Sequence, residues 1–509
     1  MRVAIRVDAS TAMGLGHLKR CVSLGKALRA LDAEVSFVTR DLGLDAAARL
    51  HGEGFEAFRL QGREHPAPAP ASDDPPHAPW AGVTVMHDAA QTIAALSNTA
   101  AQWDWVVVDS YAFDARWHRG VRDALGARIC VIDDLADRAL DCDLLVDHNA
   151  ASNHRSKYAA RTAARTRILG GPRFALLDPK YEHAAVHLVR PQVRSIGVFM
   201  GGTDPWNASI AAVRACRIGA AFDGPIEIAT TRANPFLDEL EALRRLDSGV
   251  SLLVDAPDLS EFFARHDLQI GAGGGAVWER CRVGSATIAL VLADNHRASL
   301  DALSKAGAVL EAASTAPEIL GAAVATLSKD APARARLSAR ARELVDGRGA
   351  ARVALAMAAA TLALRPARAQ DARPVLAWRN AEVTRRHFRD PSELDAQAHV
   401  AWWTRCLASP EQRLLIAHCG SCDVGVLRLD IAPGGAQAEV SLYLDPALHG
   451  LGLGAALLTA AQAWTRQHEP SLGRLMAEVL PGNEASAAAF RAARFQPDGD
   501  QHWTWSPPQ

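Results

Sequence analysis

A histidine beside two glycines stands where the first strand of the chain should turn into its first helix. Residues 14–17 read Gly-Leu-Gly-His, between the apolar run Arg2–Val7 and a helix predicted from about Leu18 to Leu28. Glycines at such a junction let backbone amides approach a phosphate, and the helix N-terminus favours an anion. Because imidazole has an unperturbed pKa of about 6.5, His17 is able to accept a proton from water without a metal. A helix-capping histidine after a flexible turn explains the tetrapeptide equally well.

A second glycine-rich turn, Gly271–Gly275, follows the predicted strand Gln269–Ile270 and leads into a helix that carries Glu279. A carboxylate one turn into that helix can accept ribose hydroxyls while the glycine amides hold phosphate. This arrangement suits a nucleoside diphosphate. The alternative is that Glu279 is an exposed helix residue.

The third glycine-rich segment, His449–Gly454, joins the predicted strand Ala438–Leu444 to a long helix. It is a loop of pyrophosphate size at a helix N-terminus.

These motifs must be positioned by three units. Strands and helices alternate over residues 1–150, and the pattern restarts after Arg190, which predicts two Rossmann-type α/β domains with parallel sheets. An alanine- and arginine-rich helical stretch near 331–364 then leads to a unit with an α+β pattern. The predicted domains are residues 1–185, 186–365 and 366–509. The proline-rich segment 62–80 predicts a surface loop, with a functional lid as the alternative.

Composition excludes several classes of protein. A net charge of −2 gives no sign of nucleic-acid binding, and no apolar run approaches the roughly 20 residues of a membrane helix. The first residues predict a strand rather than a signal segment, so we expect a cytoplasmic protein. Cys419-Gly420-Ser421-Cys422 is the one cysteine pair at metal spacing; it lacks further ligands, and a hairpin turn is favoured over zinc.

Residues 1–355 resemble the UDP-2,4-diacetamido-2,4,6-trideoxy-β-L-altropyranose hydrolases of pseudaminic acid biosynthesis, which are relatives of the GT-B glycosyltransferases. The motifs that carry the resemblance occur in order along the chain: RVDAS (6–10), GLGHLKRC (14–21), DSY (109–111), DDLADR (133–138), CDLLVD (142–147), GGTDP (201–205), GAGGGAVWE (271–279) and DGRGA (346–350).

The resemblance implies a GT-B-like pair of domains that hydrolyses a UDP-linked acetamido sugar at the anomeric carbon. No cluster of acidic or histidine residues in the first 355 residues suggests a metal site, so we expect no metal. His17 would be the base that deprotonates the attacking water, and Asp8 would support it. The remaining roles are substrate binding: the amides of Gly14 and Gly16 facing the β-phosphate, Gly202, Thr203, Gly274, Gly275 and Glu279 holding UDP, and Asn295 near the sugar. Two positions depart from the family pattern, Gly275-Ala276 in place of a hydroxyl residue and His296 in place of Gln.

Residues 366–509 resemble the GNAT acetyltransferases, in particular those that acetylate the 4-amino group of the precursor sugar in the same pathway. The cosubstrate implied is acetyl-CoA, its pyrophosphate held by the amides of Leu451, Gly452 and Gly454, with Asn483 in the later motif of the fold. His449 departs from the Gln or Arg that usually opens the loop.

The tyrosine that many members use as general acid near position 490 is absent. Tyr443, the only tyrosine of this domain, lies on the strand that should receive pantetheine, so Tyr443, Ser486 or water would protonate the thiolate. Tyr443 as an ordinary strand residue is the alternative. Glu439 is the candidate base for the amine, or else a solvent-facing edge residue.

In the pathway that the resemblance implies, acetylation immediately precedes hydrolysis. We therefore expect a bifunctional enzyme that acetylates a UDP-4-amino sugar and then hydrolyses the product. Two other readings remain open. One is a GT-B glycosyltransferase with an appended acetyltransferase, and the other is a non-catalytic protein that binds a nucleotide sugar.

Overall fold

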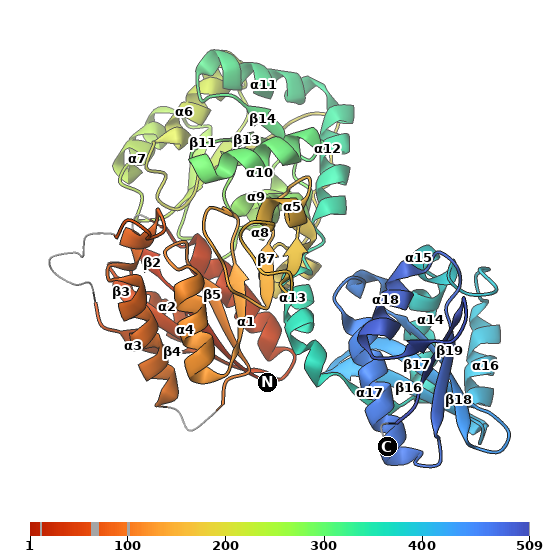
Figure 1. Cartoon of the computed structure of the whole chain (residues 1–509). Coiled ribbons are helices and arrows are strands. Elements are labelled where there is room, and N and C mark those ends of the chain that lie inside the picture. Colours follow the sequence, from red (N-terminus) through yellow and green to blue (C-terminus); the bar gives the residue numbers. More distant parts are fainter. Residues whose placement is uncertain (11–12, 63–70, 99–101, 508–509) are drawn as a thin grey trace. The chain divides into compact units, whose positions relative to one another are not determined.

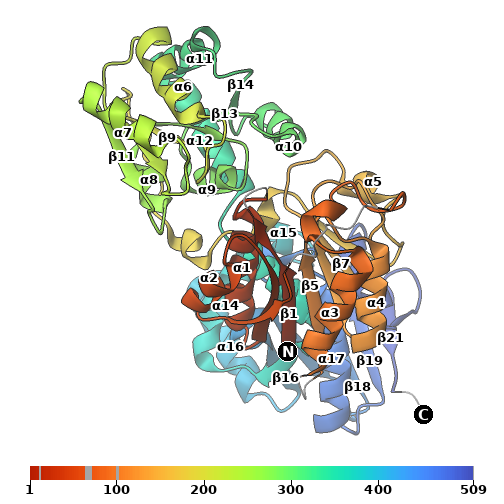
Figure 2. The same ribbon diagram turned by 90° about the vertical axis from the view of Figure 1, so that its left-hand side faces the viewer.

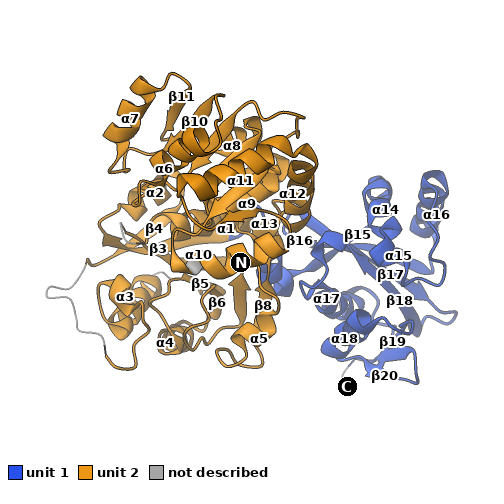
Figure 3. Ribbon diagram, turned by 90° about the horizontal axis from the view of Figure 1, so that it is seen from above, with its two compact units in different colours: residues 1, 30–33, 354–509 blue, residues 2–29, 34–353 orange. Residues whose placement is uncertain are grey.

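The computed structural model describes residues 1–10, 13–62, 71–98 and 102–507, except for the side chain of Asn295 (Figures 1 and 2). Most of the predicted proline-rich loop, residues 63–70, lies outside the described residues. The chain forms two compact units, one of residues 2–29 and 34–353 and one of residues 1, 30–33 and 354–509 (Figure 3). No helix in the described part of the chain has the length and apolar character that a membrane span requires.

The first sheet of the larger unit is parallel throughout, in the order β2-β3-β1-β5-β6-β7-β8, with β4 also paired to β3. Its strands are β1 (Arg2–Val7), β2 (Ala9–Ser10), β3 (Glu34–Leu42), β4 (Glu56–Leu60), β5 (Trp105–Asp109), β6 (Arg128–Ile132), β7 (Leu144–Asp147) and β8 (Arg167–Gly170). Its helices are α1 (Gly16–Arg29), α2 (Ala46–Gly52), α3 (Val85–Ser97), α4 (Ala115–Leu125) and α5 (His154–Tyr158).

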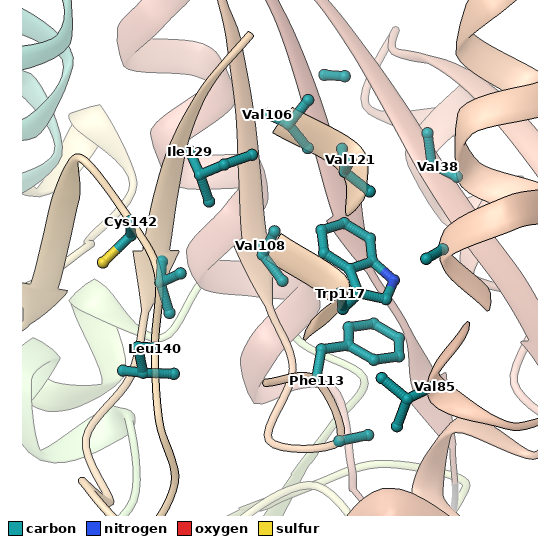
Figure 4. Packing of buried hydrophobic residues seen from close by; sticks show 14 of the residues in the cluster. Val38, Val85, Val106, Val108, Phe113, Trp117, Val121, Ile129, Leu140 and Cys142 are labelled. Carbon is teal, nitrogen blue, oxygen red and sulfur yellow. The ribbon is translucent and has the colours of Figure 1, made fainter. Parts of the chain in front are cut away.

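A continuous apolar core fixes this sheet against α3 and α4. Val106 and Val108 of β5 pack under Trp117 of α4, whose indole stacks on Phe113 at 5.1 Å between ring centroids (Figure 4). Parallel strands are buried on both faces, which is why β1 and β5 read as nearly uninterrupted apolar runs. Both strands have the bounds that the sequence predicts.

The second sheet is also parallel, in the order β11-β10-β9-β12-β13-β14. Its strands are β9 (Ile196–Phe199), β10 (Ile226–Thr230), β11 (Val250–Val254), β12 (Leu268–Ala272), β13 (Thr287–Leu290) and β14 (Leu310–Ala312). Its helices are α6 (Ala208–Arg214), α7 (Leu237–Leu246), α8 (Ser260–Arg265), α9 (Ala276–Val283), α10 (Asp294–Lys305), α11 (Pro317–Lys329), α12 (Ala331–Leu344) and α13 (Gly349–Ala358).

The smaller unit holds a mixed sheet in the order β15-β16-β17-β18-β19-β21-β20. Its strands are β15 (Ala363–Pro366), β16 (Gln412–Cys419), β17 (Cys422–Ile431), β18 (Gln437–Leu444), β19 (Arg474–Glu478), β20 (Gln496–Pro497) and β21 (His502–Trp505). Its helices are α14 (Ala372–Asn380), α15 (Glu382–Arg385), α16 (Ala396–Ala408), α17 (Leu453–His468) and α18 (Glu484–Ala492). As predicted, residues 419–422 form the tip of a hairpin, in which Cys419 pairs with Cys422.

Strands β18 and β19 form the one parallel pair of this mixed sheet among the described strands, and they separate early. Their pairing covers Gln437–Glu439 against Arg474–Met476, while β18 continues to Leu444. The backbone of residues 440–444 therefore pairs with β17 on one side and has no β19 partner on the other. This divergence opens the sheet beside the loop that leads into α17.

Candidate active sites

The first candidate site lies at the carboxyl ends of β1 and β5, where the strand order reverses. Strand β1 pairs with β3 on one side and with β5 on the other, and β5 follows β3 and β4 in the sequence. Such a switch point is where open α/β sheets bind ligands. His17, the second residue of α1, meets Asp109, the last residue of β5, with Nδ1 2.6 Å from Oδ1.

The contact with Asp109 selects the tautomer of His17. A carboxylate only accepts hydrogen bonds, so Nδ1 must carry the proton that it donates. Arg20 Nη2 lies 3.1 Å from the same Nδ1, but a guanidinium only donates and cannot replace Asp109 as its partner. In the neutral imidazole with its proton on Nδ1, the lone pair is on Nε2, which is the form that a general base requires.

Arg20 holds the Asp109 carboxylate on both oxygens, from Nε and Nη2 at 2.6 Å each. Burial alone would raise the pKa of Asp109, yet the charges of Arg20 and His17 outweigh it and hold that pKa well below its usual range. Asp109 is thus an ionised, rigidly held partner for the imidazole.

A second carboxylate, that of Asp134, lies 3.9 Å from Nη1 of Arg20. The hydroxyl of Tyr111 and the amide of Asn149 both donate to it, the latter at 2.9 Å. The ring of Tyr111 also meets the His17 ring edge-on, at 4.8 Å between centroids. Burial and the neighbouring Asp134 raise the pKa of Tyr111, so the phenol remains protonated and donates at neutral pH.

His148, just after β7, is a buried neutral imidazole near the same group. Burial, followed by the charge of Arg20, lowers its pKa to about 4. Its ring edge contacts Trp278 of α9, at 5.9 Å between centroids, so the carboxyl ends of the two parallel sheets are linked here.

Asp8 has other partners than the predicted ones. Its carboxylate accepts from Arg6 at 2.5 Å and from the backbone of Arg40 at 2.7 Å, in a buried group that includes Asp88. The structure brings Asp109, not Asp8, to His17. Sequence reasoning assigned Asp109 no role; the available signal was an aspartate that ends a buried strand, the usual place for a site residue in this architecture.

The predicted residues of the second domain gather at two turns. Gly202 and Thr203 follow β9, and Gly274 and Gly275 join β12 to α9. Because β9 and β12 are neighbours with β10 and β13 on opposite sides, this is the switch point of the second sheet. Thr231 donates to the carbonyl of Gly202 at 2.7 Å and fixes the first turn. Asn295 lies in α10, but its side chain is outside the described residues.

Glu279 is half-buried on α9, in contrast to the exposed alternative. Burial raises its pKa, and the hydroxyl of Tyr181 is its hydrogen-bond partner. The side chain of Glu279 is thus held by Tyr181, on the helix that follows the glycine turn.

In the smaller unit, the predicted pyrophosphate loop leads directly into α17. Gly452 precedes the helix at φ 68°, a left-handed conformation that disfavours side chains. The first turn of a helix leaves N–H groups free for an anion. Of the three predicted amides, that of Leu451 already donates to Leu448 at 3.3 Å. Asn483 caps α18 by accepting from Ser486 at 3.1 Å.

Tyr443 and Glu439 occupy β18 and share one face of it, since they are four residues apart. Burial raises the pKa of Tyr443, whose ring meets Phe388 at 6.2 Å between centroids. The side chain of Glu439 is 51% exposed and lies 4.0 Å from Arg389. Four residues of strand span about 13 Å, so the two groups do not meet at a single atom.

No group of three or more His, Cys, Asp or Glu residues in the described part of the chain is arranged to hold a metal ion.

Residues 361–496 match the family described as acetyltransferase (GNAT) domain. No curated protein has a sequence that matches the chain. Together with the two parallel sheets, the match confirms the predicted fold class: a pair of Rossmann-type domains followed by an α+β acetyltransferase domain.

Three solved structures illustrate the similarity. MurG of Acinetobacter baumannii is 14% identical, with 69% of this chain and 98% of MurG covered at a TM-score of 0.47. Aminoglycoside acetyltransferase AAC(6')-Ib, in complex with coenzyme A and kanamycin, is 17% identical. The match covers 28% of this chain and 93% of the acetyltransferase, at a TM-score of 0.26. Spermidine N-acetyltransferase from Vibrio cholerae, in complex with CoA and spermine, is 15% identical. The match covers 28% of this chain and 95% of the spermidine acetyltransferase, at a TM-score of 0.27.

Proposed function

We propose that the chain is a bifunctional enzyme of pseudaminic acid biosynthesis. Its C-terminal domain transfers an acetyl group to the 4-amino group of a UDP-linked amino sugar. Its two Rossmann-type domains then hydrolyse the resulting UDP-2,4-diacetamido sugar to UDP and the free sugar. The observation that carries the hydrolase assignment is the hydrogen bond between His17 and Asp109 at the switch point of the first sheet.

The hydrolysis we propose is a direct displacement by water. Nε2 of His17 takes a proton from the water as its oxygen bonds to the anomeric carbon, and the bond from that carbon to the β-phosphate oxygen breaks. The electron pair leaves with UDP. Asp109 stabilises the imidazolium that forms and holds its orientation. A single displacement predicts inversion at the anomeric carbon.

The proposed UDP site consists of the two glycine turns after β9 and β12, with Glu279 beside them. Adjacent turns at one switch point place several backbone amides on one diphosphate. This supports UDP as the leaving group and the second domain as the part that binds it.

The acetyltransferase assignment rests on the family match of residues 361–496. The divergence of β18 from β19 and the left-handed Gly452 before α17 fit a pantetheine arm and a pyrophosphate, respectively. Acetyl-CoA supplies an activated acyl group for attack by the sugar amine. Tyr443 is the candidate donor to the departing sulfur, since its phenol stays protonated at neutral pH.

One experiment tests both assignments. The full chain is incubated with the UDP-4-amino sugar and acetyl-CoA, and mass spectrometry follows acetylation and UDP release. We expect acetylated UDP-sugar to appear first, and then UDP and free diacetamido sugar in equal amounts. Transfer of the sugar to an added acceptor in place of water would show a glycosyltransferase instead. Binding of UDP without turnover would contradict both the hydrolase and the glycosyltransferase.

A further inference from the structure

Arg280 is a buried cation, without an ion-paired carboxylate among the described residues, next to the glycine turns of the second domain. Its side chain is fully buried, and Nη2 donates to the carbonyl of Ala272 at 2.6 Å. Nε and Nη1 are buried and have no hydrogen-bond partner among the described residues. No carboxylate of the described chain lies within ion-pair distance of this guanidinium.

The guanidinium lies at the carboxyl ends of two neighbouring strands. Gly271 of β12 is paired with Phe199 of β9, and a Cβ atom at Gly271 would collide with both Nη1 of Arg280 and the carbonyl of Phe199. The absence of a side chain at 271 is thus what makes room for Arg280. Both strands lead directly into the proposed diphosphate turns, Gly201–Thr203 and Gly273–Gly275.

Other buried arginines of the same unit are compensated. Arg6 is also fully buried, but the carboxylates of Asp8 and Asp88 lie 2.5 and 2.6 Å from its guanidinium. Arg334 is fully buried without a carboxylate, yet its guanidinium donates to four backbone carbonyls. Arg280 has one such bond. A buried charge with unused donors destabilises the fold unless a partner accepts its hydrogen bonds or neutralises it.

The groups around Arg280 compensate its charge only in part. The Phe263 ring centroid lies 5.8 Å from the guanidinium carbon, and Glu279 interacts with Arg280 electrostatically without forming an ion pair. Glu279 points toward Tyr181, and its own pKa is raised by burial. Cys281 is a buried thiol with a raised pKa, and His296 of α10 is held neutral because burial lowers its pKa. Burial lowers the pKa of Arg280 itself to about 10, so it is still charged at neutral pH.

We propose that Arg280 is the buried counter-charge for a nucleoside diphosphate held on the turns after β9 and β12. Arg280 is a positioning residue, since it acts through the carbonyl of Ala272 and the charge beneath the turns. The turn amides and the N-terminus of α9 face the anion from above, and the guanidinium attracts it from below. The inference rests on the proposed function, because it takes the second domain as the UDP site.

The test is calorimetry on the full chain with uridine, UMP and UDP as probes. Arg280→Met keeps most of the side-chain volume and removes the charge, and Arg280→Lys keeps the charge. Because the attraction between opposite charges is weakly screened at low dielectric, we expect Arg280→Met to weaken UDP binding by about ten-fold or more. UMP binding should weaken less and uridine binding should not change, while Arg280→Lys should restore most of the UDP affinity.

Arg334→Met is the matched control, since it removes a fully buried guanidinium of the same domain that is held by carbonyls near residues 190 and 191. It should lower the thermal midpoint and leave UDP affinity unchanged. Without UDP, Arg280→Met should be no less stable than the unsubstituted chain, because it removes a buried charge with no ion-paired carboxylate and two unused donors. Equal losses for uridine and UDP, or normal UDP affinity in Arg280→Met, would overturn the inference. Failure of the unsubstituted chain to bind UDP would instead reject the proposed function.

Discussion

Nδ1 of His17 and Oδ1 of Asp109 lie 2.6 Å apart, although the two residues are 92 positions apart in the sequence. The strand order causes the meeting: β5 returns to pair with β1 after the chain has built the other half of the sheet. His17 and the carboxylate that orients it are therefore supplied by α1, which follows β1, and by β5 on the other side of the switch point.

Replacing His17 with Asn should remove the base and preserve much of the side-chain volume. We expect UDP release to fall by roughly 10²- to 10⁴-fold, the usual contribution of a general base, with acetylation unchanged. UDP release is measured by coupled assay on the acetylated substrate. His51→Asn, at an exposed histidine of α2, is the control and should keep full activity. Near-normal UDP release by His17→Asn would exclude His17 from the mechanism.

Replacing Asp109 with Asn should make stability respond differently to pH. The folded pKa of Asp109 lies below its unfolded value of about 3.9, so its stabilisation is full above that value and is lost as the pH falls. Asp109→Asn should therefore be less stable than the unsubstituted chain at pH 7 and at pH 5. The gap in urea midpoints should narrow toward pH 3. A gap that stays constant to pH 3 would show that the ionised carboxylate does not stabilise the fold.

Replacing Tyr443 with Phe should slow acetyl transfer. The phenol stays protonated because burial raises its pKa, so its loss removes a proton donor and leaves the ring in place. We expect kcat to fall on the order of 10²-fold with little change in the KM for acetyl-CoA. Phe388→Leu changes the aromatic neighbour of Tyr443 and controls for packing. An unchanged kcat in Tyr443→Phe would make Tyr443 an ordinary strand residue and leave Ser486 or water as the donor.

Replacing Gly452 with Val should weaken acetyl-CoA binding. Gly452 has φ 68° at the start of α17, where a β-branched residue is strained and blocks close approach to the backbone. We expect the KM for acetyl-CoA to rise by about ten-fold or more, with hydrolysis of acetylated substrate unchanged. Gly434→Val imposes similar strain at φ 95° in the turn between β17 and β18 and should not alter that KM. Loss of hydrolysis in Gly452→Val would show that the two activities are structurally coupled.

The C-terminal domain should need residues that precede position 366. Strand β15, residues 363–366, pairs with four residues of β16, and Ala367 donates to Leu414. A fragment of residues 354–509 should therefore fold, while one of residues 368–509 loses an edge strand of its sheet. We expect the shorter fragment to have a urea midpoint lower by about 1 M. Equal midpoints for the two fragments would show that β15 does not contribute to this domain.

The sequence predicts strands best where burial is complete. β1 and β5 were predictable to the residue because both faces are covered and the apolar run is unbroken. β4 was missed: it is the outermost strand beside β3, and its half-exposed pattern carries little signal. The three glycine turns were also predictable, since each stands between a strand and a helix.

The contacts of the first site were not predictable in the same way. The pairing of His17 with Asp109 and that of Tyr111 with Asp134 depend on which strands become neighbours. Strand order is decided by tertiary packing, and no local pattern around His17 specifies it. Asp8 was the nearest carboxylate along the chain, but the buried guanidinium of Arg6 engages it instead.

The division of the chain into units also has a consequence for its synthesis. The larger unit ends at residue 353, and the smaller unit takes from the earlier chain only residues 1 and 30–33. Both parallel sheets therefore leave the ribosome before β15 is made. Domains generally fold as they emerge, at about 5–20 residues per second, so the last third of the chain follows over roughly 10–30 s. The two Rossmann-type domains, for which we propose the hydrolase activity, would then be folded before the acetyltransferase domain exists. If the proposed activities hold, a ribosome that stalls in that interval would release a protein that cleaves the diacetamido substrate but does not make it.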